Sequence, residues 1–278
     1  MKRRQVKKNK LKQEFIKQLQ SFAKSLNKYV STTDNQWTIK GFIDIFENIY
    51  TITSDTKMIS KIMEIHLFPK LIEFSKKYGY RLAFAEKQNW YPDITLISLG
   101  NDKIKFAVDL KTTYALDNEK CNGFTLGSHG EYFTNRKSKK NIQFPYGEYL
   151  GHYCLGIIYS RNIDSNICNS KIYALKNLNN IPSVIGNFTF FANEKWRIAS
   201  DKPGSGNTAN IGSTKKINEL LNGNGIFYKI FGEKGEKWFD DYWMNYGKIT
   251  ITDNKGNVKK ITKLDEFLKY KNINRLIK

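Results

Sequence analysis

The chain opens with the pattern of an amphipathic helix behind a basic tail. Seven of the first twelve residues are Lys or Arg. Apolar residues then recur at helical spacing, at Leu11, Phe15, Leu19, Phe22 and Leu26. We therefore expect a basic tail and helix over residues 1–30, followed by one domain over residues 31–278. The tail is interpreted as a solvated terminus, with an arm that contacts phosphates as the alternative.

Further patterns of helix and strand follow along the chain. Residues 37–52 alternate as in a strand, and a helix is expected from about Lys57, capped near Ser54 or Asp55, with Pro69 kinking or interrupting it. The remaining expectations are a buried strand at 153–159, a strand pair around 188–198, and helices around 238–246 and 264–270.

The segment around Asn101 predicts a hairpin that brings two aspartates together. Residues 93–97 and 104–111 have strand character, and Gly-Asn-Asp at 100–102 is a strong turn signal. A symmetric antiparallel hairpin centred on Asn101 pairs Asp93 with Asp109, and Cβ atoms of directly opposed residues lie about 5 Å apart. Two carboxylates at that spacing repel each other unless a cation or a proton lies between them.

The polar face of this hairpin has the chemistry of a hard-metal site. Period two places Lys111 beside Asp109, while the opposite face carries Phe106, Val108 and Leu110. Oxygen ligands select Mg2+ or Mn2+, which hold waters and phosphate oxygens. Lys111 would orient an attacking water or offset charge on the phosphate. The alternative is an ordinary amphipathic hairpin whose mixed charges serve solubility.

Composition points to a polyanionic partner. The 278 residues include 46 Lys and Arg against 26 Asp and Glu, a formal net charge of +20, and release of counterions drives such proteins onto nucleic acid. An anionic membrane is the competing partner, but no apolar run approaches the length that spans a bilayer. Three cysteines without CxxC spacing are typical of reduced thiols, and three scattered histidines do not indicate zinc. We expect a soluble cytoplasmic protein without a membrane contact.

Three other segments leave two interpretations each. Residues 204–212 match a dinucleotide fingerprint formally, but no helix opens there and no P-loop lysine follows, so no nucleotide cofactor is expected. The segment is either a loop whose asparagines read adenine or a plain surface turn. Gln88 and Asn89 are groove-reading amides or turn formers. Glu64 shares a helix face with Lys57 and Lys61, which by itself indicates a solvated ion pair with Lys61.

The motif Pro92-Asp93, then Asp109-Leu110-Lys111, resembles that of the PD-(D/E)XK nuclease superfamily. Further segments, in the same order and at nearly constant spacing, resemble the EcoRV-type restriction endonucleases within it: residues 54–57, 88–93, 109–114, 124–127 and 204–212. This resemblance implies an α/β fold with a mixed central β-sheet flanked by helices. It implies a homodimer on double-stranded DNA and a Mg2+-dependent cut, with Mn2+ able to substitute. The implied target is GATATC, cut bluntly to leave 5′-phosphate and 3′-hydroxyl ends.

The resemblance also assigns residues to roles. Asp93, Asp109 and Glu64 become metal ligands, overriding the solvated interpretation of Glu64, and Lys111 becomes the catalytic lysine. The residues placed on DNA are Gly204, Ser205, Gly206, Asn207, Thr208 and Asn210 in a major-groove loop, Gln88 and Asn89 in a minor-groove loop, and Thr113 and Lys57. Asn207 is the principal reader.

Two positions depart from the family pattern. Ala209 stands where a second threonine is expected, and Lys87 where a further glutamine is expected. Two other functions remain open at this point: a repair or recombination nuclease of the same superfamily that recognises DNA structure, and a basic DNA-binding protein without catalysis.

Overall fold

A five-stranded mixed sheet forms the centre of the protein. The structure is a computed structural model that describes residues 2–87, 89–162, 171–204, 209–252, 256 and 258–272. The strands lie in the order β3-β4-β5-β7-β9, with bounds Tyr80–Phe84, Ile94–Ser98, Lys105–Tyr114, Tyr149–Arg161 and Ile185–Glu194. Strands β5 and β7 are parallel and the other neighbours are antiparallel. The predicted α/β class with a mixed central sheet is confirmed.

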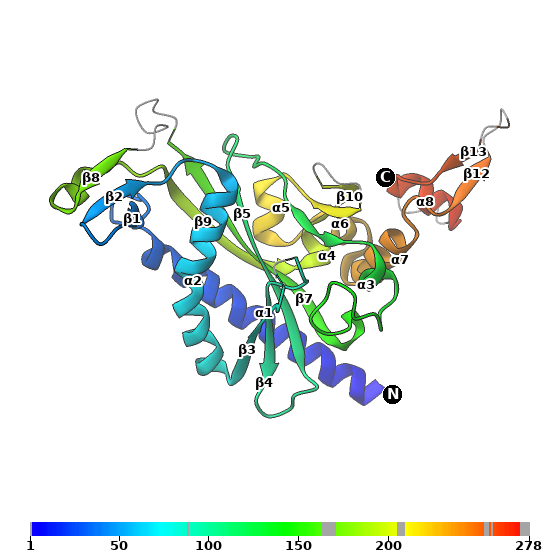
Figure 1. Ribbon diagram of the computed structural model, residues 1–278. Helices are drawn as coiled ribbons and strands as arrows, with labels where there is room; N and C mark the ends of the chain where they lie inside the picture. The colour runs from blue at the N-terminus through cyan, green and yellow to red at the C-terminus, as the bar shows by residue number, and fades with distance from the viewer. Residues whose placement is uncertain are drawn as a thin grey trace.

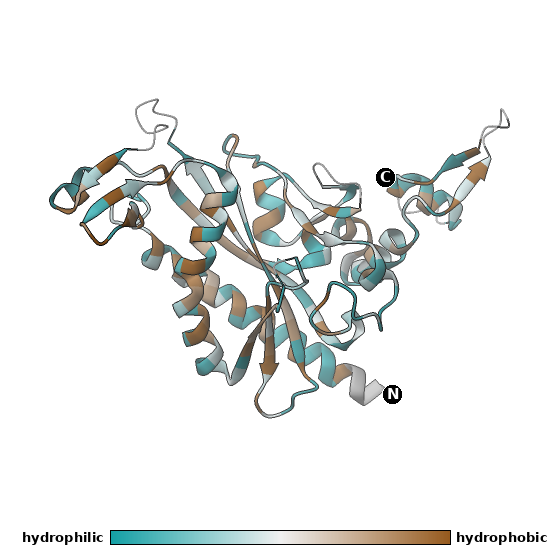
Figure 2. Cartoon of the chain, in the orientation of Figure 1, coloured by the Kyte–Doolittle hydropathy of each residue, from teal (hydrophilic) through white to brown (hydrophobic). Residues whose placement is uncertain are grey.

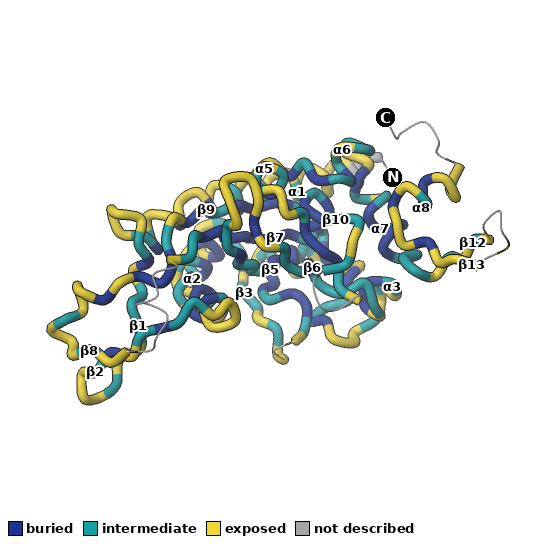
Figure 3. The backbone as a smooth tube through the Cα atoms, turned by 90° about the horizontal axis from the view of Figure 1, so that it is seen from above, coloured by how far each residue is buried: buried dark blue, intermediate teal, exposed yellow. Residues whose placement is uncertain are grey.

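Two long helices cover one face of the sheet. Helix α1 (Lys2–Val30) runs across β9 and β7, and α2 (Thr56–Tyr78) packs beside it (Figure 1). The apolar positions of α1 face the core, where Phe15 stacks on Phe106 at a centroid distance of 3.9 Å. In Figure 3 the central strands run dark blue, which marks them as buried. Helix α1 therefore shares its hydrophobic core with the sheet.

Helix α2 begins and ends where local chemistry requires. Asp55 is its N-cap, and the side chain accepts a hydrogen bond from the Met58 N–H at 2.9 Å. Gly79 ends it in the left-handed region at φ 71°. The predicted cap is confirmed. The helix continues through Pro69, so of the two predicted outcomes, a kink or an interruption, the interruption is wrong. Packing of the flanking turns against the core outweighs the missing N–H.

Short helices and a small sheet cover the other face. The small sheet has the order β10-β11-β6, with bounds Ala199–Pro203, Asn210–Ser213 and Thr125–Ser128. The helices are α3 (Glu131–Thr134), α4 (Lys195–Ile198), α5 (Ile217–Asn222), α6 (Ile226–Phe231) and α7 (Gly235–Asn245), with 3-10 turns η1 (Tyr146–Glu148) and η3 (Gly232–Lys234). A second core fills this layer, around fully buried aromatic residues such as Trp243 and Phe227.

Two smaller units project from the body (Figure 1). One is a three-stranded sheet of β1 (Gly41–Ile43), β2 (Asn48–Thr51) and β8 (Ile172–Ala174), which leads into the 3-10 turn η2 (Leu175–Asn180). The other is the hairpin of β12 (Thr250–Thr252) and β13 (Val258–Lys260) beside α8 (Leu264–Tyr270). None of the described helices is long and apolar enough to cross a membrane.

The predicted elements differ from the structure at two further places. The alternating segment 37–52 is a hairpin of two short strands, β1 and β2, instead of one. The predicted strand pair around 188–198 is wrong, because β9 ends at Glu194 and one turn of helix α4 follows, in which Trp196 and Ile198 are buried. An apolar run of this length does not distinguish a buried strand from a buried turn of helix. The predicted strand at 153–159 and the last two helices are confirmed.

Candidate active site

The β4–β5 hairpin has the predicted register. Ile94 pairs with Val108 and Ile97 with Lys105, so the hairpin is symmetric about Asn101. The turn closes through hydrogen bonds at both ends, including one from the Ile104 N–H to the Asn101 carbonyl at 2.9 Å. Asp93 directly precedes β4 and therefore comes to lie opposite Asp109.

Backbone hydrogen bonds fix the two carboxylates against each other. The Asp93 N–H donates to Asp109 Oδ1 at 3.2 Å, and the Leu110 N–H donates to Asp93 Oδ2 at 2.8 Å. Lys111 Nζ lies 3.6 Å from Asp93 Oδ2 and 3.4 Å from Asp109 Oδ2. The three charged side chains that the sequence placed on one face therefore do meet.

Burial sets the electrostatics of this cluster. The Asp109 side chain is 7% exposed, against 37% for Asp93. Burial raises the pKa of the Asp109 carboxyl above its ordinary value, Lys111 opposes this rise, and Asp93 adds to it. Burial alone would lower the pKa of Lys111, but Asp109 and Asp93 outweigh it and hold this pKa above its ordinary value. Lys111 is therefore a permanent cation here, and a further cation would help to keep Asp109 ionised.

A cavity opens over the acidic pair and is bounded by several loops. Its lining includes Asp93, Asp109 and Lys111 from the hairpin, Asn89 and Trp90 before it, Thr125, Gly127 and Ser128 from β6, and Asn210 from β11. Strand β11 pairs with β6 through Asn210 and Ser128. This pairing places the end of the segment that was predicted to read DNA beside the predicted catalytic groups.

Comparison with known proteins assigns the family. The model of the family described as restriction endonuclease EcoRV matches residues 33–272. This chain belongs to the EcoRV family of restriction endonucleases. The type II restriction enzyme EcoRV of Escherichia coli is 36% identical over 219 residues, which cover 78% of this chain and 85% of the relative. The predicted resemblance is thereby confirmed, and the protein is a type II restriction endonuclease, a hydrolase that acts on DNA.

Glu64 lies beside the acidic pair without joining it in this EcoRV-family enzyme. It forms an ion pair with Lys61 at 3.0 Å, as its position on the helix predicts. It also lines a cavity with Asp93 and Lys111, between α2 and the hairpin. Among the residues that the structure describes, no three acidic, histidine or cysteine side chains form a ready-made metal site. Glu64 therefore lies on a cavity wall near Asp93, and the metal contact that the resemblance implies would require its carboxylate to leave Lys61.

The predicted DNA-binding residues other than Thr113 fall into three groups. Asn89 and Asn210 line the cavity over the acidic pair, and Lys57 lines an adjoining one with Asn89 and Asp93. Gly204 closes the base of the loop that was predicted to read DNA, since its N–H donates to the Asn210 carbonyl at 2.8 Å. A Cβ at position 204 would lie 2.5 Å from Cγ2 of Thr125, so only glycine fits against β6 there. Outside the described residues lie Gln88, Ser205, Gly206, Asn207 and Thr208.

Thr113 does not present its side chain to DNA in this structure. It is 4% exposed, and its hydroxyl donates to the backbone carbonyl of Asn122. The resemblance predicts a DNA contact at this position, but the hydroxyl is already bonded inside the protein. A side-chain contact with DNA would require that bond to break, which costs about 1 kcal/mol or more for a buried group.

Sequence reasoning missed one buried lysine behind the wall of the cavity over the acidic pair. Lys195 follows β9 and is 3% exposed. Burial lowers its pKa to about 7, while Asp109 acts in the opposite direction. The one available signal was its position between the apolar run 188–192 and Trp196, where a lysine is unexpected.

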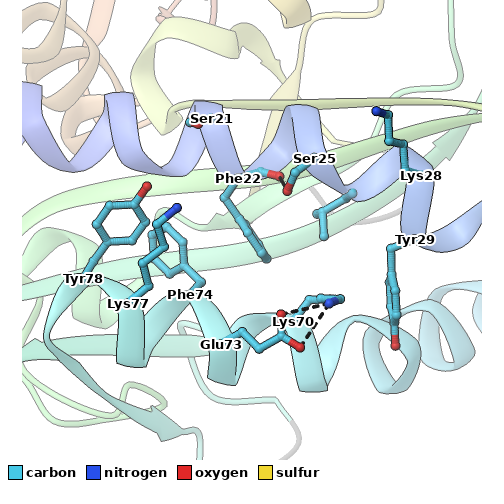
Figure 4. Close-up of a pocket in the computed structure, with 11 residues that line it drawn as sticks. Ser21, Phe22, Ser25, Lys28, Tyr29, Lys70, Glu73, Phe74, Lys77 and Tyr78 are labelled. Atoms are coloured by element: carbon cyan, nitrogen blue, oxygen red, sulfur yellow. Dashed lines mark hydrogen bonds and ion pairs between the residues drawn. The ribbon is translucent and has the colours of Figure 1, made fainter.

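A second hollow lies between α1 and α2, on the other layer of the molecule (Figure 4). Its floor is apolar, with Phe22 and Phe74, and its rim carries an ion pair of Lys70 and Glu73 at 2.8 Å. A single acidic residue that is already paired does not provide the donor set of the hairpin. The cavity over Asp93 and Asp109 therefore remains the candidate active site.

Proposed function

We propose that this EcoRV-family enzyme cuts double-stranded DNA at GATATC, at the central phosphodiester bond of each strand, and leaves blunt ends with 5′-phosphates. The nuclease domain comprises residues 31–278 together with helix α1, which packs into the same core, and the enzyme acts in the cytoplasm as part of restriction-modification defence. The observation that carries the proposal is the hydrogen-bonded arrangement of Asp93, Asp109 and Lys111 beside the base of the recognition loop.

The donor set of the site fits a hard divalent cation. Asp93 and Asp109 offer carboxylate oxygens, and Glu64 supplies a third from the α2 wall of the neighbouring cavity. Such oxygen ligands suit Mg2+, with Mn2+ as a substitute, and do not suit softer metals. When bound, the cation would hold water and a phosphate oxygen and offset charge at the phosphorus atom.

The residues of the hairpin have separate roles in hydrolysis. A water oxygen attacks the phosphorus atom and loses a proton to solvent, while the bond to the 3′ oxygen breaks and that oxygen takes up a proton. The Lys111 ammonium lies within 3.6 Å of both carboxylates, where it orients the water or stabilises the charge that builds on the phosphate. The backbone hydrogen bonds to Asp93 and Asp109 fix these groups before substrate arrives, which lowers the reorganisation that the reaction requires.

Recognition of the sequence belongs to the loop that Gly204 and Asn210 close. Asn207 at its centre has the two-pronged amide that pairs with adenine in the major groove. Gln88 and Asn89 approach from the minor-groove side, and exposed Lys57 contacts a phosphate. The net charge of +20 supplies attraction for the duplex that does not depend on sequence.

A palindromic target calls for a two-fold dimer. The small sheet of β1, β2 and β8 exposes a set of large apolar side chains that we name the β1–β2–β8 patch: Phe42, Ile43, Ile45, Phe46, Tyr50 and Ile172, which are 43–90% exposed. In Figure 2 this projecting unit carries brown segments at its surface. Exposed apolar patches on soluble proteins mark interaction sites. In the proposed dimer this patch packs against the same patch of a second copy of the chain.

Digestion of a DNA of known sequence tests the function. With Mg2+, the purified enzyme should convert it into discrete fragments with blunt ends at GATATC, and a chelator should abolish the cut. Lys111→Met should bind but not cut, whereas Lys103→Met, in the exposed turn of the same hairpin, should cut normally. Nicking that follows DNA structure would instead indicate a repair nuclease. Salt-sensitive binding without any cleavage would indicate a non-catalytic DNA-binding protein.

A further inference from the structure

Lys195 is a buried cation that the hairpin chemistry leaves unexplained. Its side chain is 3% exposed, and Nζ has no hydrogen-bond partner among the described residues. Taking an ammonium group out of water is strongly unfavourable unless nearby charges compensate. The groups around Lys195 offset part of this cost.

Aromatic rings enclose the ammonium. Nζ lies 5.0 Å from the ring centre of Tyr91, 5.4 Å from that of Phe133 and 5.5 Å from that of Tyr146. The negative faces of such rings attract a cation. Because Tyr91 directly precedes Pro92 and Asp93, this cage is continuous with the hairpin.

The ammonium lies directly behind the wall of the active-site cavity. Gly127 lines that cavity together with Asp109, and a Cβ added to Gly127 would lie 3.5 Å from Lys195 Nζ. Among the surrounding charges, Asp109 favours the Lys195 ammonium most. Arg136, which opposes it, is itself paired with Asp240 at 2.9 Å. Asp109 is therefore the main counter-charge of Lys195.

The net charge of the site affects how tightly it binds a metal ion. Asp93 and Asp109 carry two negative charges, and Lys111 and Lys195 carry two positive ones. The third proposed ligand, Glu64, is already paired with Lys61 at 3.0 Å, so the charges balance before any ion arrives. We infer that Lys195 is a positioning residue that acts through Asp109 and holds the metal affinity of the DNA-free protein low, because an entering divalent cation meets a site that is already neutral. The inference rests on the proposed function, since it takes Asp93 and Asp109 as the metal ligands.

Binding of Mn2+ to the full-length, DNA-free protein tests this inference. Free Mn2+ is followed by electron paramagnetic resonance at about pH 6, below the pKa of about 7 of Lys195, where most of the molecules keep this lysine protonated. Lys195→Met removes the charge and keeps the length of the side chain, so it should bind Mn2+ on the order of tenfold more tightly than the wild type. Lys195→Arg keeps the charge and should bind as the wild type does. Asp109→Asn should weaken binding and so identifies the site.

Lys12→Met is the matched control. Lys12 is also a largely buried lysine, but it pairs with Glu236 at 2.7 Å and Glu194 at 3.2 Å, and its loss should leave Mn2+ affinity unchanged. Thermal melting shows which variants are folded, and Lys195→Gln replaces Lys195→Met if the latter is not. Unchanged Mn2+ affinity in the Lys195 variant, with weakened affinity in Asp109→Asn, overturns this inference and leaves the proposed function standing. If Asp109→Asn also has no effect, the proposed metal site fails and the inference fails with it.

Discussion

Asp93 and Asp109 are joined through the backbone: the N–H of Asp93 donates a hydrogen bond to Oδ1 of Asp109 over 3.2 Å. The return bond, from the Leu110 N–H to Asp93 Oδ2, is 2.8 Å long. The register of β4 on β5, instead of side-chain packing alone, therefore sets the separation of the carboxylates. A slip of one residue would turn Asp109 to the opposite, apolar face of the strand.

Asp109→Asn should slow cleavage by roughly a thousandfold and leave the fold intact. The amide has the shape of the carboxylate but lacks its charge, and losing a fixed charge in an active site lowers rates by roughly a thousandfold. Cleavage of plasmid DNA under single-turnover conditions measures this loss. Asp102→Asn, the same change in the exposed turn of the same hairpin, should cut at the wild-type rate. Full activity in Asp109→Asn would contradict the proposed site.

Glu64→Gln should raise the Mg2+ concentration needed for half-maximal cleavage, by roughly 10- to 100-fold if it acts as a supporting ligand. The control lies on the same helix: Glu73 pairs with Lys70 at 2.8 Å in the same i,i+3 geometry as Glu64 with Lys61. Glu73→Gln removes an equivalent ion pair away from the acidic pair. Equal Mg2+ requirements in the two variants would show that Glu64 is only a surface ion-pair partner.

Asn207→Ala should relax recognition at one base pair. A bidentate amide contact with adenine contributes about 1–3 kcal/mol of discrimination. The measurement compares cleavage of GATATC with that of duplexes that carry each single-base change. Asn218→Ala, on the exposed face of α5, provides the control. Loss of rate on all duplexes alike would assign Asn207 to phosphate contact or to folding.

Ile45→Lys should convert a dimer into monomers. Ile45 is 90% exposed in the β1–β2–β8 patch, and a charge at a buried dimer contact is strongly unfavourable. Sedimentation equilibrium measures the change. Val258→Lys places the same charge on another exposed apolar residue, 73% exposed on β13, and should leave the dimer unchanged. A wild type that is monomeric and fully active would remove the dimer from the proposal.

Lys195→Met should raise the melting temperature most at low pH. Because burial lowers the pKa of Lys195 from 10.5 to about 7, the folded state binds this proton less tightly than the unfolded chain does. The ionised lysine therefore destabilises the fold below pH 7, and this cost fades as the pH rises from about 7 to 10.5. The stabilisation by Lys195→Met should shrink over the same range, as calorimetric melts would show.

Lys12→Met should lower the melting temperature, which is the opposite of the effect expected for Lys195→Met. Burial lowers the pKa of Lys12, but Glu194 and Glu236 outweigh burial and raise it. The charged form of Lys12 therefore stabilises the fold, and the variant should melt below the wild type at neutral pH.

A difference in melting temperature between Lys195→Met and the wild type that stays constant at every pH would contradict the cost assigned to burying the Lys195 charge.

The sequence by itself determined the hairpin, because its information is local. Turn residues at 100–102 and alternation on both sides fix which residues oppose each other, and this arithmetic places Asp93 opposite Asp109 and Lys111 beside them. The cap of α2 at Asp55 was readable for the same reason, since it depends on a few adjacent residues. The ordered motifs around the hairpin also determined the family.

Only the tertiary structure decided what comes together from distant parts of the chain. The pairing of β11 with β6 places Asn210 at the cavity of Asp93, and the end of β9 places Lys195 behind Asp109, which is 86 positions earlier in the sequence. Burial of Thr113 places its hydroxyl in a hydrogen bond to the backbone carbonyl of Asn122, inside the protein. No local pattern encodes these relationships, because long-range packing and desolvation depend on which surfaces the folded sheet leaves to be covered.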